Sequence, residues 1–215
     1  MPPGGIAAVV LAAGKSSRMG EPKALLRLQG STTFLGAITA TLRFCGVTEI
    51  VVVTGAHRTA VASEAAQLGV ATAHNTAFES GRMSSLKAGA RAVRERGLRV
   101  PLLMWPVDCP AVRPATVARL LDVANEAHHA RRPEIHVPVY ENRGGHPIVL
   151  RSAEVARLEV APLEANLRDW LRCGVSRRVE LPVDDPAVLD NVDTLADYAT
   201  LLAREQAPEP EGAPA

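Results

Sequence analysis

The sequence predicts a single-domain, three-layer α/β/α fold built on a mostly parallel, Rossmann-like sheet. In the first half of the chain, short apolar runs rich in β-branched residues alternate with segments of helical periodicity, and short connections join them. The 215 residues suffice for one domain with a substantial core, and 47% hydrophobic with 22% charged residues is typical of a globular protein. Right-handed crossovers would place the C-terminal strand ends, and with them a ligand crevice, along one edge of the sheet.

This pattern is described by a set of strands and a set of helices. Apolar and β-branched composition predicts strands at Ile6–Leu11, Glu49–Thr54, Val70–His74, Pro101–Trp105, Ile135–Pro138, Pro147–Leu150 and Arg178–Pro182. Periodicity predicts helices at Thr33–Phe44, Thr59–Gln67, Ser84–Arg96, Ala115–Ala130, Glu164–Cys173 and Thr194–Arg204. The second half is less regular, which leaves room for an antiparallel strand.

The domain is expected to span residues 1–204. Residues 205–215 are rich in Pro, Glu and Ala and cannot bury a core, so we expect a disordered C-terminal tail. The three cysteines, Cys45, Cys109 and Cys173, are far apart and form no C-x-x-C pair. This spacing argues against a disulfide framework or a structural zinc site and favours a reducing compartment, the cytoplasm.

Charge and composition argue against two classes of partner. A net charge of +1 gives no global field for nucleic acid or a membrane surface, and 3% aromatic residues leave little material for stacking bases. The apolar run that ends at Ala13 is far shorter than a membrane span. We therefore expect no nucleic-acid partner and no membrane association, and any anion binding must be local.

The most informative segment follows the first predicted strand, where the chain reads L-A-A-G-K-S-S-R-M-G and continues into Pro22 and Lys23. Small residues let backbone N–H groups approach an anion closely, and Arg18 and Lys23 add fixed positive charge. This is the chemistry needed to hold a nucleoside triphosphate. The nucleotide-binding residues expected in this loop are Leu11, Ala12, Ala13, Gly14 and Lys23.

Two better-known phosphate loops do not fit this segment. A Walker A loop needs a glycine five residues before Gly14, where this chain has Val9. A dinucleotide fingerprint needs glycines where this chain has Ser16 and Met19. The loop is therefore a different type of anion cradle.

A carboxylate stands at a second strand end. Asp108 follows the strand predicted at Pro101–Trp105 and is flanked by Pro106 and Pro110, which hold the turn extended and rigid. Mg²⁺ prefers oxygen ligands, usually one or two carboxylates together with substrate phosphates and waters. We expect Asp108 to hold Mg²⁺, because it lies too far upstream to cap the helix that follows Pro114.

A third candidate segment runs from Asn75 to Gly89. Gly81 permits close backbone approach, and the hydroxyls of Ser84 and Ser85 at a helix start can bind a base or ribose as well as cap the helix. Asn75, Gly81, Ser84 and Ser85 are therefore candidate nucleotide-binding residues.

These motifs resemble those of the molybdenum-cofactor nucleotidyltransferase-like family, the MobA-like and cytidylyltransferase-like NTP transferases. The family's loop reads roughly L-A-(A/G)-G-x-S-x-R-M-G with a lysine shortly after, its metal aspartate stands in a G-D-x-P or V-D-x-P turn, and N-P-x-x-x-x-G-x-x-S-S lines its nucleotide pocket. Thr76 stands where the family has Pro. The resemblance covers roughly residues 6–204 and implies a fold of the nucleotide-diphospho-sugar transferase type.

The resemblance adds further site residues. The segment after Asn191 is similar to a C-terminal family segment in which Asp193 would be a second metal ligand, although Leu195 replaces the frequent Pro. Capping of the last helix by Asp193 or Thr194 explains the same residues equally well. The trio Gly145, His146 and Pro147 looks like the segment that faces the acceptor substrate, where His146 would orient a phosphate.

The activity that the resemblance implies is transfer of a nucleoside monophosphate from a nucleoside triphosphate to a small phosphorylated acceptor, with release of pyrophosphate. Arg18, Lys23 and Asp108 would be the catalytic residues and Mg²⁺ the cofactor. The Ala-Ala-Gly and Gly-His-Pro segments favour CTP and a molybdopterin-type acceptor, with a cofactor-delivery protein as a partner. The alternatives are a GTP-using or sugar- or alditol-phosphate nucleotidyltransferase and a non-catalytic nucleotide-binding homologue.

Overall fold

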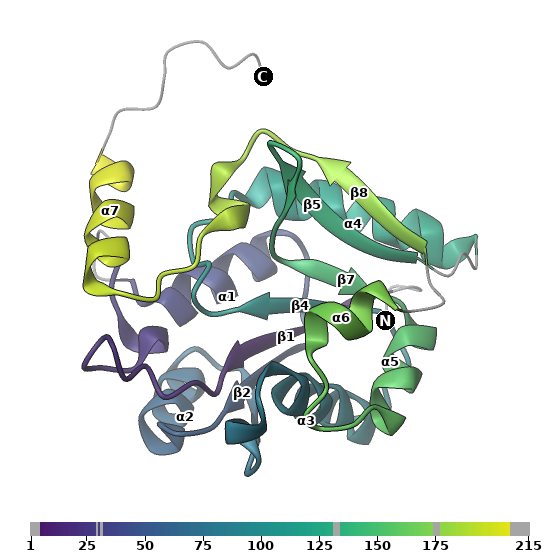
Figure 1. Ribbon diagram of the computed structural model, residues 1–215, viewed down its shortest axis with the longest axis horizontal. Coiled ribbons are helices and arrows are strands. Elements are labelled where there is room, and N and C mark those ends of the chain that lie inside the picture. Colours follow the sequence, from purple (N-terminus) through teal and green to yellow (C-terminus); the bar gives the residue numbers. More distant parts are fainter. Residues whose placement is uncertain (1–4, 29, 31, 131–133, 174–176, 207–215) are drawn as a thin grey trace.

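An eight-stranded mixed sheet forms the centre of the molecule (Figure 1). The computed structural model describes residues 5–28, 30, 32–130, 134–173 and 177–206. Its strands are β1 (Ala7–Ala12), β2 (Ile50–Thr54), β3 (Ala71–His74), β4 (Leu102–Pro106), β5 (Glu134–Tyr140), β6 (Arg143–Gly144), β7 (Ile148–Leu150) and β8 (Arg177–Pro182). Each strand predicted from the sequence is present, and the two-residue β6 is an addition.

The sheet order is β3-β2-β1-β4-β7-β5-β6, with β8 paired to β5. Strands β3, β2, β1 and β4 are mutually parallel, and β5 is parallel to β8. Strand β7 runs antiparallel to both β4 and β5, so it is the antiparallel strand that the irregular second half suggested.

Helices cover both faces of this sheet. They are α1 (Phe34–Phe44), α2 (Arg58–Gln67), α3 (Arg82–Glu95), α4 (Pro114–His129), α5 (Ser152–Val160), α6 (Leu167–Arg172) and α7 (Leu195–Gln206). Helix α5 was not predicted. Helix α7 includes Glu205 and Gln206, which the sequence assigned to the tail, and the rest of that segment, residues 207–215, lies outside the described residues.

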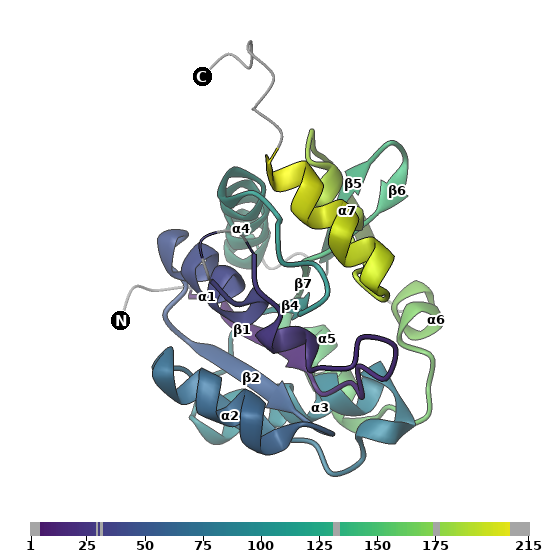
Figure 2. The same ribbon diagram turned by 90° about the vertical axis from the view of Figure 1, so that its left-hand side faces the viewer.

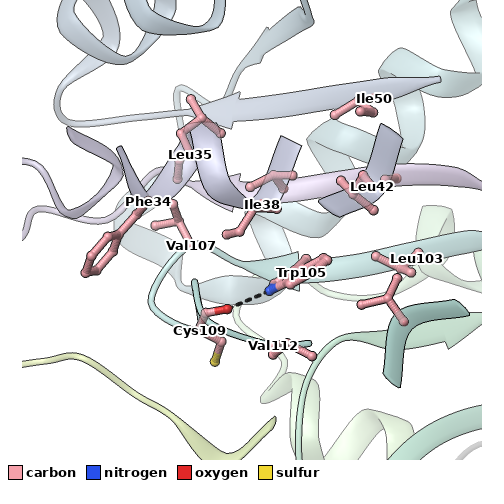
Figure 3. Close-up of a cluster of buried hydrophobic side chains, with 14 of the residues drawn as sticks. Phe34, Leu35, Ile38, Leu42, Ile50, Leu103, Trp105, Val107, Cys109 and Val112 are labelled. Carbon is pink, nitrogen blue, oxygen red and sulfur yellow. Dashed lines mark hydrogen bonds between the residues drawn. The ribbon is translucent and has the colours of Figure 1, made fainter. Parts of the chain in front are cut away.

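Successive side chains of a strand point to opposite faces of the sheet, so the molecule has two separate hydrophobic cores. In β1, Ala8, Val10 and Ala12 face the helices α1, α2 and α4, whereas Ala7, Val9 and Leu11 face α3, α5 and α6. Figure 3 shows the first core, in which Trp105 of β4 packs beside the apolar side chains of α1. Helix α7 joins the same core through an edge-to-face contact between Tyr198 and Phe34, whose ring centroids are 5.8 Å apart. Figure 2 shows the molecule from the side on which α7 lies. The predicted three-layer α/β/α architecture is therefore confirmed.

Register fixes which loops meet at the edge of the sheet. Leu11 of β1 pairs with Pro106 of β4, and the backbone N–H of Val107 donates to the Leu11 carbonyl at 3.1 Å. Because parallel neighbours end at the same edge, the loop after β1 and the turn after β4 lie side by side. Among the described helices, none is both long and apolar enough to cross a membrane.

Helix α3 packs closely on the sheet at Gly89. A Cβ atom at this position would overlap Cγ1 of Val9 and lie 3.0 Å from Cγ2 of Val53. Both valines are fully buried, Val9 in β1 and Val53 in β2, so neither has room to move away.

The connection between β6 and β7 carries His146, which is followed by a cis peptide bond to Pro147. The backbone N–H of His146 donates to the Val188 carbonyl at 2.8 Å, and a Cβ atom on Gly145 would overlap the same carbonyl. Burial, assisted by the positive charge of Arg82, lowers the pKa of His146 to about 4. The imidazole is therefore neutral in the folded protein at pH 7.

We predict that Gly89→Ala destabilises the protein, by up to about 2 kcal/mol. Overpacking of a core costs about 1–3 kcal/mol, and this exceeds the gain of about 1 kcal/mol that alanine brings to a helix. Urea unfolding measures the difference, and Gly5→Ala, whose added Cβ meets no atom within 4 Å, is the control. Equal or greater stability of Gly89→Ala would contradict the close packing described here.

We predict that His146 makes stability depend on pH. An unfolded chain binds a proton at this residue near pH 6.5 and the folded chain only near pH 4, so His146 lowers stability progressively as the pH falls between these values. The full loss is about 3 kcal/mol. Unfolding experiments at pH 7 and pH 4.5 measure how much stability each variant loses between these two pH values. His146→Gln should lose less than the wild type, whereas His74→Gln, which removes an exposed histidine, should lose as much as the wild type.

Candidate active site

A pocket of about 320 Å³ opens at the C-terminal ends of β1 and β4. It is the edge at which the sequence predicted a ligand crevice. Its walls come from the loop after β1, the start of α3, the turn after β4 and the segment before α7. The lining residues are Leu11, Ala12, Ala13, Gly14, Lys15, Ser16, Ser17, Arg18, Pro22, Lys23, Ala24, Phe78, Gly81, Arg82, Ser85, Pro106, Val107, Asp108 and Asp193.

The loop after β1 is held in shape by its own backbone and by neighbouring loops. Ser16 has a φ of +49°, an uncommon conformation for a residue with a side chain, and its hydroxyl accepts a hydrogen bond of 3.1 Å from the N–H of Lys23. Its carbonyl accepts from the N–H of Met19 at 2.9 Å. The ring of His57 contacts the Lys15 carbonyl at 2.7 Å. These contacts order a loop that contains only one glycine before Gly20.

Two carboxylates converge on one ammonium group in the pocket. The Nζ atom of Lys23 lies 2.5 Å from Oδ1 of Asp193 and 3.8 Å from Oδ2 of Asp108. The side chains of Lys23 and Asp108 are only 13% and 12% exposed, so water screens their charges weakly. Lys23, Asp108 and Asp193 therefore form one charged cluster.

Two arginines extend this cluster. Arg18 Nη2 lies 3.3 Å from Oδ1 of Asp193, and Arg82 Nη2 lies 3.4 Å from both Oδ2 of Asp108 and Oδ1 of Asn191. With Lys15, four cationic side chains line the pocket against two carboxylates. The pocket is therefore locally positive in a chain whose net charge is only +1, as anion binding requires.

The neighbouring charges keep Asp193 ionised. Burial raises the pKa of this carboxyl, but the hydrogen bond and positive charge of Lys23, together with Arg18, outweigh burial and hold the pKa below its usual value. Asn191 also donates a side-chain hydrogen bond to Asp193.

Helix α7 is capped without the Asp193 side chain. The Thr194 hydroxyl accepts from the N–H of Asp197 at 3.2 Å, and Oδ2 of Asp197 accepts from the N–H groups of Thr194 at 2.8 Å and Asp193 at 3.0 Å. This reciprocal pattern is a capping box. Of the two predicted candidates, Thr194 therefore makes the cap, and the carboxylate of Asp193 faces the pocket.

The turn that carries Asp108 is fixed from two sides. The indole N–H of Trp105 donates to the Cys109 carbonyl at 2.8 Å (Figure 3). The N–H of Val192 donates to the Asp108 carbonyl at 3.0 Å, and the Cys109 thiol contacts the Asp190 carbonyl at 2.6 Å. Burial, with the negative charge of Asp108, raises the pKa of the Cys109 thiol, which therefore remains a protonated donor. The turn and the segment before α7 thus form one unit.

Two of the predicted nucleotide-binding residues lie outside the wall of this pocket. Nδ2 of Asn75 donates to the hydroxyls of Ser84 at 2.8 Å and Ser85 at 3.0 Å, while Oδ1 accepts from the N–H of Ala77 at 2.9 Å. The Ser84 hydroxyl lies 2.8 Å from the Gly81 carbonyl. Asn75 and Ser84 are buried and stabilise the Gly81 turn, whereas Gly81 and Ser85 line the pocket, and the nucleotide-binding role of all four stays a prediction.

The predicted acceptor segment lies outside the wall of the pocket. Gly145, His146 and Pro147 are not among its lining residues, and their link to the pocket is the electrostatic effect of Arg82 on His146.

Several residues of the pocket were not predicted from the sequence, among them Lys15, Pro22, Phe78 and, most importantly, Arg82. Its position one residue after Gly81, at the start of a candidate nucleotide-binding helix, was the available signal.

The donor set of the pocket fits a divalent cation shared with a substrate. Within the described residues, no group of three or more His, Cys, Asp or Glu side chains could hold a metal alone. Asp108 and Asp193 supply two carboxylates, and Mg²⁺ takes its remaining ligands from phosphates and water. These residues therefore suit a metal that binds with a nucleotide rather than a closed structural site.

Three curated relatives align with nearly the whole chain. The molybdenum cofactor cytidylyltransferase of Escherichia coli K12 is 26% identical over 197 residues, covering 91% of this chain and 95% of its own length. The phosphoenolpyruvate guanylyltransferase of Rubrobacter xylanophilus is 31% identical, covering 88% of each chain. The nicotine blue oxidoreductase of Paenarthrobacter nicotinovorans is 33% identical, covering 92% of this chain and 96% of its own length.

A solved structure shares the fold over nearly its whole length. The Rv0371c protein of Mycobacterium tuberculosis H37Rv superposes with a TM-score of 0.76 at 30% identity, covering 93% of this chain and 98% of its own. A second structure of Rv0371c, in complex with manganese, has a TM-score of 0.71, 28% identity, and coverage of 94% of this chain and all of its own.

Residues 8–181, most of the chain, match the family described as the MobA-like NTP transferase domain. This stretch includes the loop after β1, the Asn75–Gly89 segment and the Asp108 turn, and it ends before Asp193. The protein thus belongs to the MobA-like NTP transferase family of nucleotidyltransferases.

Proposed function

We propose that this protein transfers a nucleoside monophosphate, CMP from CTP, to a small phosphorylated acceptor such as the molybdopterin cofactor, releasing pyrophosphate. The observation that supports this best is the pocket in which Lys23 stands between Asp108 and Asp193, with Arg18 and Arg82 beside them. A triphosphate and a divalent cation need this mixture of cations and carboxylates in one place.

The proposed reaction needs positioning more than acid–base chemistry. An acceptor phosphate oxygen attacks the α-phosphorus, and the bond from the α-phosphorus to the bridging oxygen breaks, so that its electron pair leaves with pyrophosphate. The nucleophile is already an anion, so no covalent enzyme intermediate and no strong base is required. Arg18 and Lys23 bind the β- and γ-phosphates and stabilise the charge that develops on the leaving pyrophosphate.

Asp108 and Asp193 would hold Mg²⁺ in this scheme. The bound metal supplies charge neutralisation and polarisation at the phosphates. The braced Asp108 turn keeps one carboxylate at a fixed distance from the loop after β1, and the capping box leaves the other carboxylate free to face the pocket. The presence of Arg18, Lys23 and Asp108 together argues against a non-catalytic nucleotide-binding homologue.

The choice of CTP rests on the loop and on one relative. Ala13 occupies the position at which guanylyl-transferring members tend to have glycine. Its carbonyl lies so close to Gly55 that a Cβ atom on Gly55 would overlap it. The cytidylyltransferase relative supports the same nucleotide, whereas the guanylyltransferase relative keeps GTP as the alternative. A sugar or alditol phosphate remains the alternative acceptor. An oxidoreductase relative is also similar, but a dinucleotide cofactor is not favoured for this chain, because Ser16 and Met19 stand where a dinucleotide fingerprint has glycines.

The cellular setting is part of the same proposal. Three free cysteines suit the reducing cytoplasm, and a molybdopterin-type product would pass to a cofactor-delivery protein. Nucleic acid is not among the proposed partners, because a net charge of +1 gives no global field that would attract it.

A substrate matrix tests this proposal. The four nucleoside triphosphates are each combined with molybdopterin and with several sugar and alditol phosphates in the presence of Mg²⁺, and pyrophosphate release is measured. We expect signal with CTP and molybdopterin. Signal only with GTP or only with a sugar phosphate supports the alternative substrates, and nucleotide binding without pyrophosphate from any acceptor contradicts catalysis.

We predict that Asp108→Asn lowers pyrophosphate release at least about 100-fold, because removing one electrostatic contact to a transferring phosphoryl group has an effect of this order. The fold should remain, since Asn keeps the size of the side chain. Asp122→Asn, an exposed site on α4 outside the pocket, is the matched control and should keep wild-type turnover. A folded Asp108→Asn variant with near-native turnover would remove Asp108 from the mechanism.

A further inference from the structure

We propose that Arg82 binds the phosphate of the acceptor and so connects the nucleotide pocket to the acceptor segment. This inference rests on the proposed nucleotidyl transfer. Both reactants in that transfer are anions, so an acceptor phosphate approaching the α-phosphorus is repelled unless a cation lies on its side of the pocket. Arg18 and Lys23 belong to the loop after β1 and are assigned to the triphosphate.

Arg82 comes from a different part of the fold. It is the first residue of α3, directly after Gly81, whose φ of +98° turns the chain into the helix at the pocket. Its side chain is 53% exposed and lines the pocket, so the guanidinium is accessible to a ligand. The loop after β1 and the start of α3 therefore supply cations from two separate elements.

The guanidinium has hydrogen-bonding capacity left. Nη2 makes two long contacts of 3.4 Å, to Asp108 and to Asn191. Within the described part of the chain, Nε and Nη1 donate no hydrogen bond that would have to be broken. A guanidinium presents five N–H donors in a planar fork that matches two phosphate oxygens. Arg82 can therefore bind a phosphate while its contact with Asp108 keeps it beside the reacting centre.

Arg82 also acts electrostatically on a histidine of the segment predicted to face the acceptor. Burial lowers the pKa of the His146 imidazole, and the positive charge of Arg82 adds to this effect. Nδ1 of His146 is buried and has no hydrogen-bond partner among the described residues. A neutral histidine beside a cation can donate or accept one hydrogen bond to a phosphate without adding charge. Arg82, which contacts Asp108, is thus a charged residue of the pocket whose electrostatic effect reaches the predicted acceptor segment.

Calorimetry with a surrogate acceptor tests this assignment. Inorganic phosphate is titrated into protein saturated with Mg²⁺ and the non-hydrolysable α,β-methylene analogue of CTP, and the analogue itself is titrated separately. The variants are Arg82→Gln, Arg82→Lys and the control Arg91→Gln, an exposed arginine on the same helix that is outside the pocket. We expect Arg82→Gln to weaken phosphate binding about tenfold or more while nucleotide affinity stays within about threefold. Arg82→Lys should fall between Gln and wild type, and Arg91→Gln should match wild type.

The outcomes separate this inference from the proposed function. If wild-type protein binds no nucleotide analogue, the proposed function fails and the assignment of Arg82 with it. If nucleotide binds but phosphate affinity is unchanged in Arg82→Gln, or wild type binds no phosphate in the millimolar range, only the assignment is overturned. If Arg82→Gln loses nucleotide affinity and keeps phosphate affinity, Arg82 belongs to the triphosphate site and the inference is wrong.

Discussion

The site depends on the parallel pairing of β1 with β4. Their register places Leu11 beside Pro106, so the loop that carries Lys23 and the turn that carries Asp108 leave the sheet at one edge. The hydrogen bond from the Val192 N–H to the Asp108 carbonyl then attaches the segment before α7 to the same turn. Residues that are 170 positions apart, Lys23 and Asp193, meet at 2.5 Å for this reason. The pocket is a consequence of sheet topology rather than of any single motif.

Charge compensation explains how two carboxylates are tolerated in a partly enclosed pocket. Taking ionised groups out of water is costly unless opposite charges and hydrogen bonds replace the water. Lys23, Arg18 and Arg82 provide this replacement for Asp108 and Asp193 in the protein alone. When a divalent cation and a triphosphate bind, the same carboxylates and cations would exchange partners, with the metal on the carboxylates and the phosphates on the cations. The compensation therefore prepares the site for both parts of its proposed substrate.

The sequence was sufficient to predict the architecture and that the loop after β1 and the Asp108 turn meet at one edge of the sheet, because long periodic segments and turn chemistry are local properties. Helix α5 escaped detection because its nine residues present few fully buried apolar side chains, among them Val155 and Leu158. The hydrogen bond between Asn75 and Ser84 could not be predicted, because a motif gives spacing and not the direction in which a buried side chain points. The ambiguity between Asp193 and Thr194 was resolved only by Asp197, which completes the helix cap in three dimensions. Arg82 was missed because its contacts with Asp108 and Asn191 are long-range.

The central claim is that Asp108 and Asp193 hold a divalent cation while Lys23 and Arg18 hold the triphosphate of the same nucleotide. A crystal structure of the protein with Mn²⁺ and the α,β-methylene analogue of CTP tests it most directly, because the anomalous signal of manganese locates the metal independently of the nucleotide density. The account predicts an anomalous peak in contact with both carboxylates and with a phosphate oxygen, and phosphates in contact with Lys23 and Arg18. A nucleotide bound in another pocket, or a metal with no contact to Asp108, would contradict it.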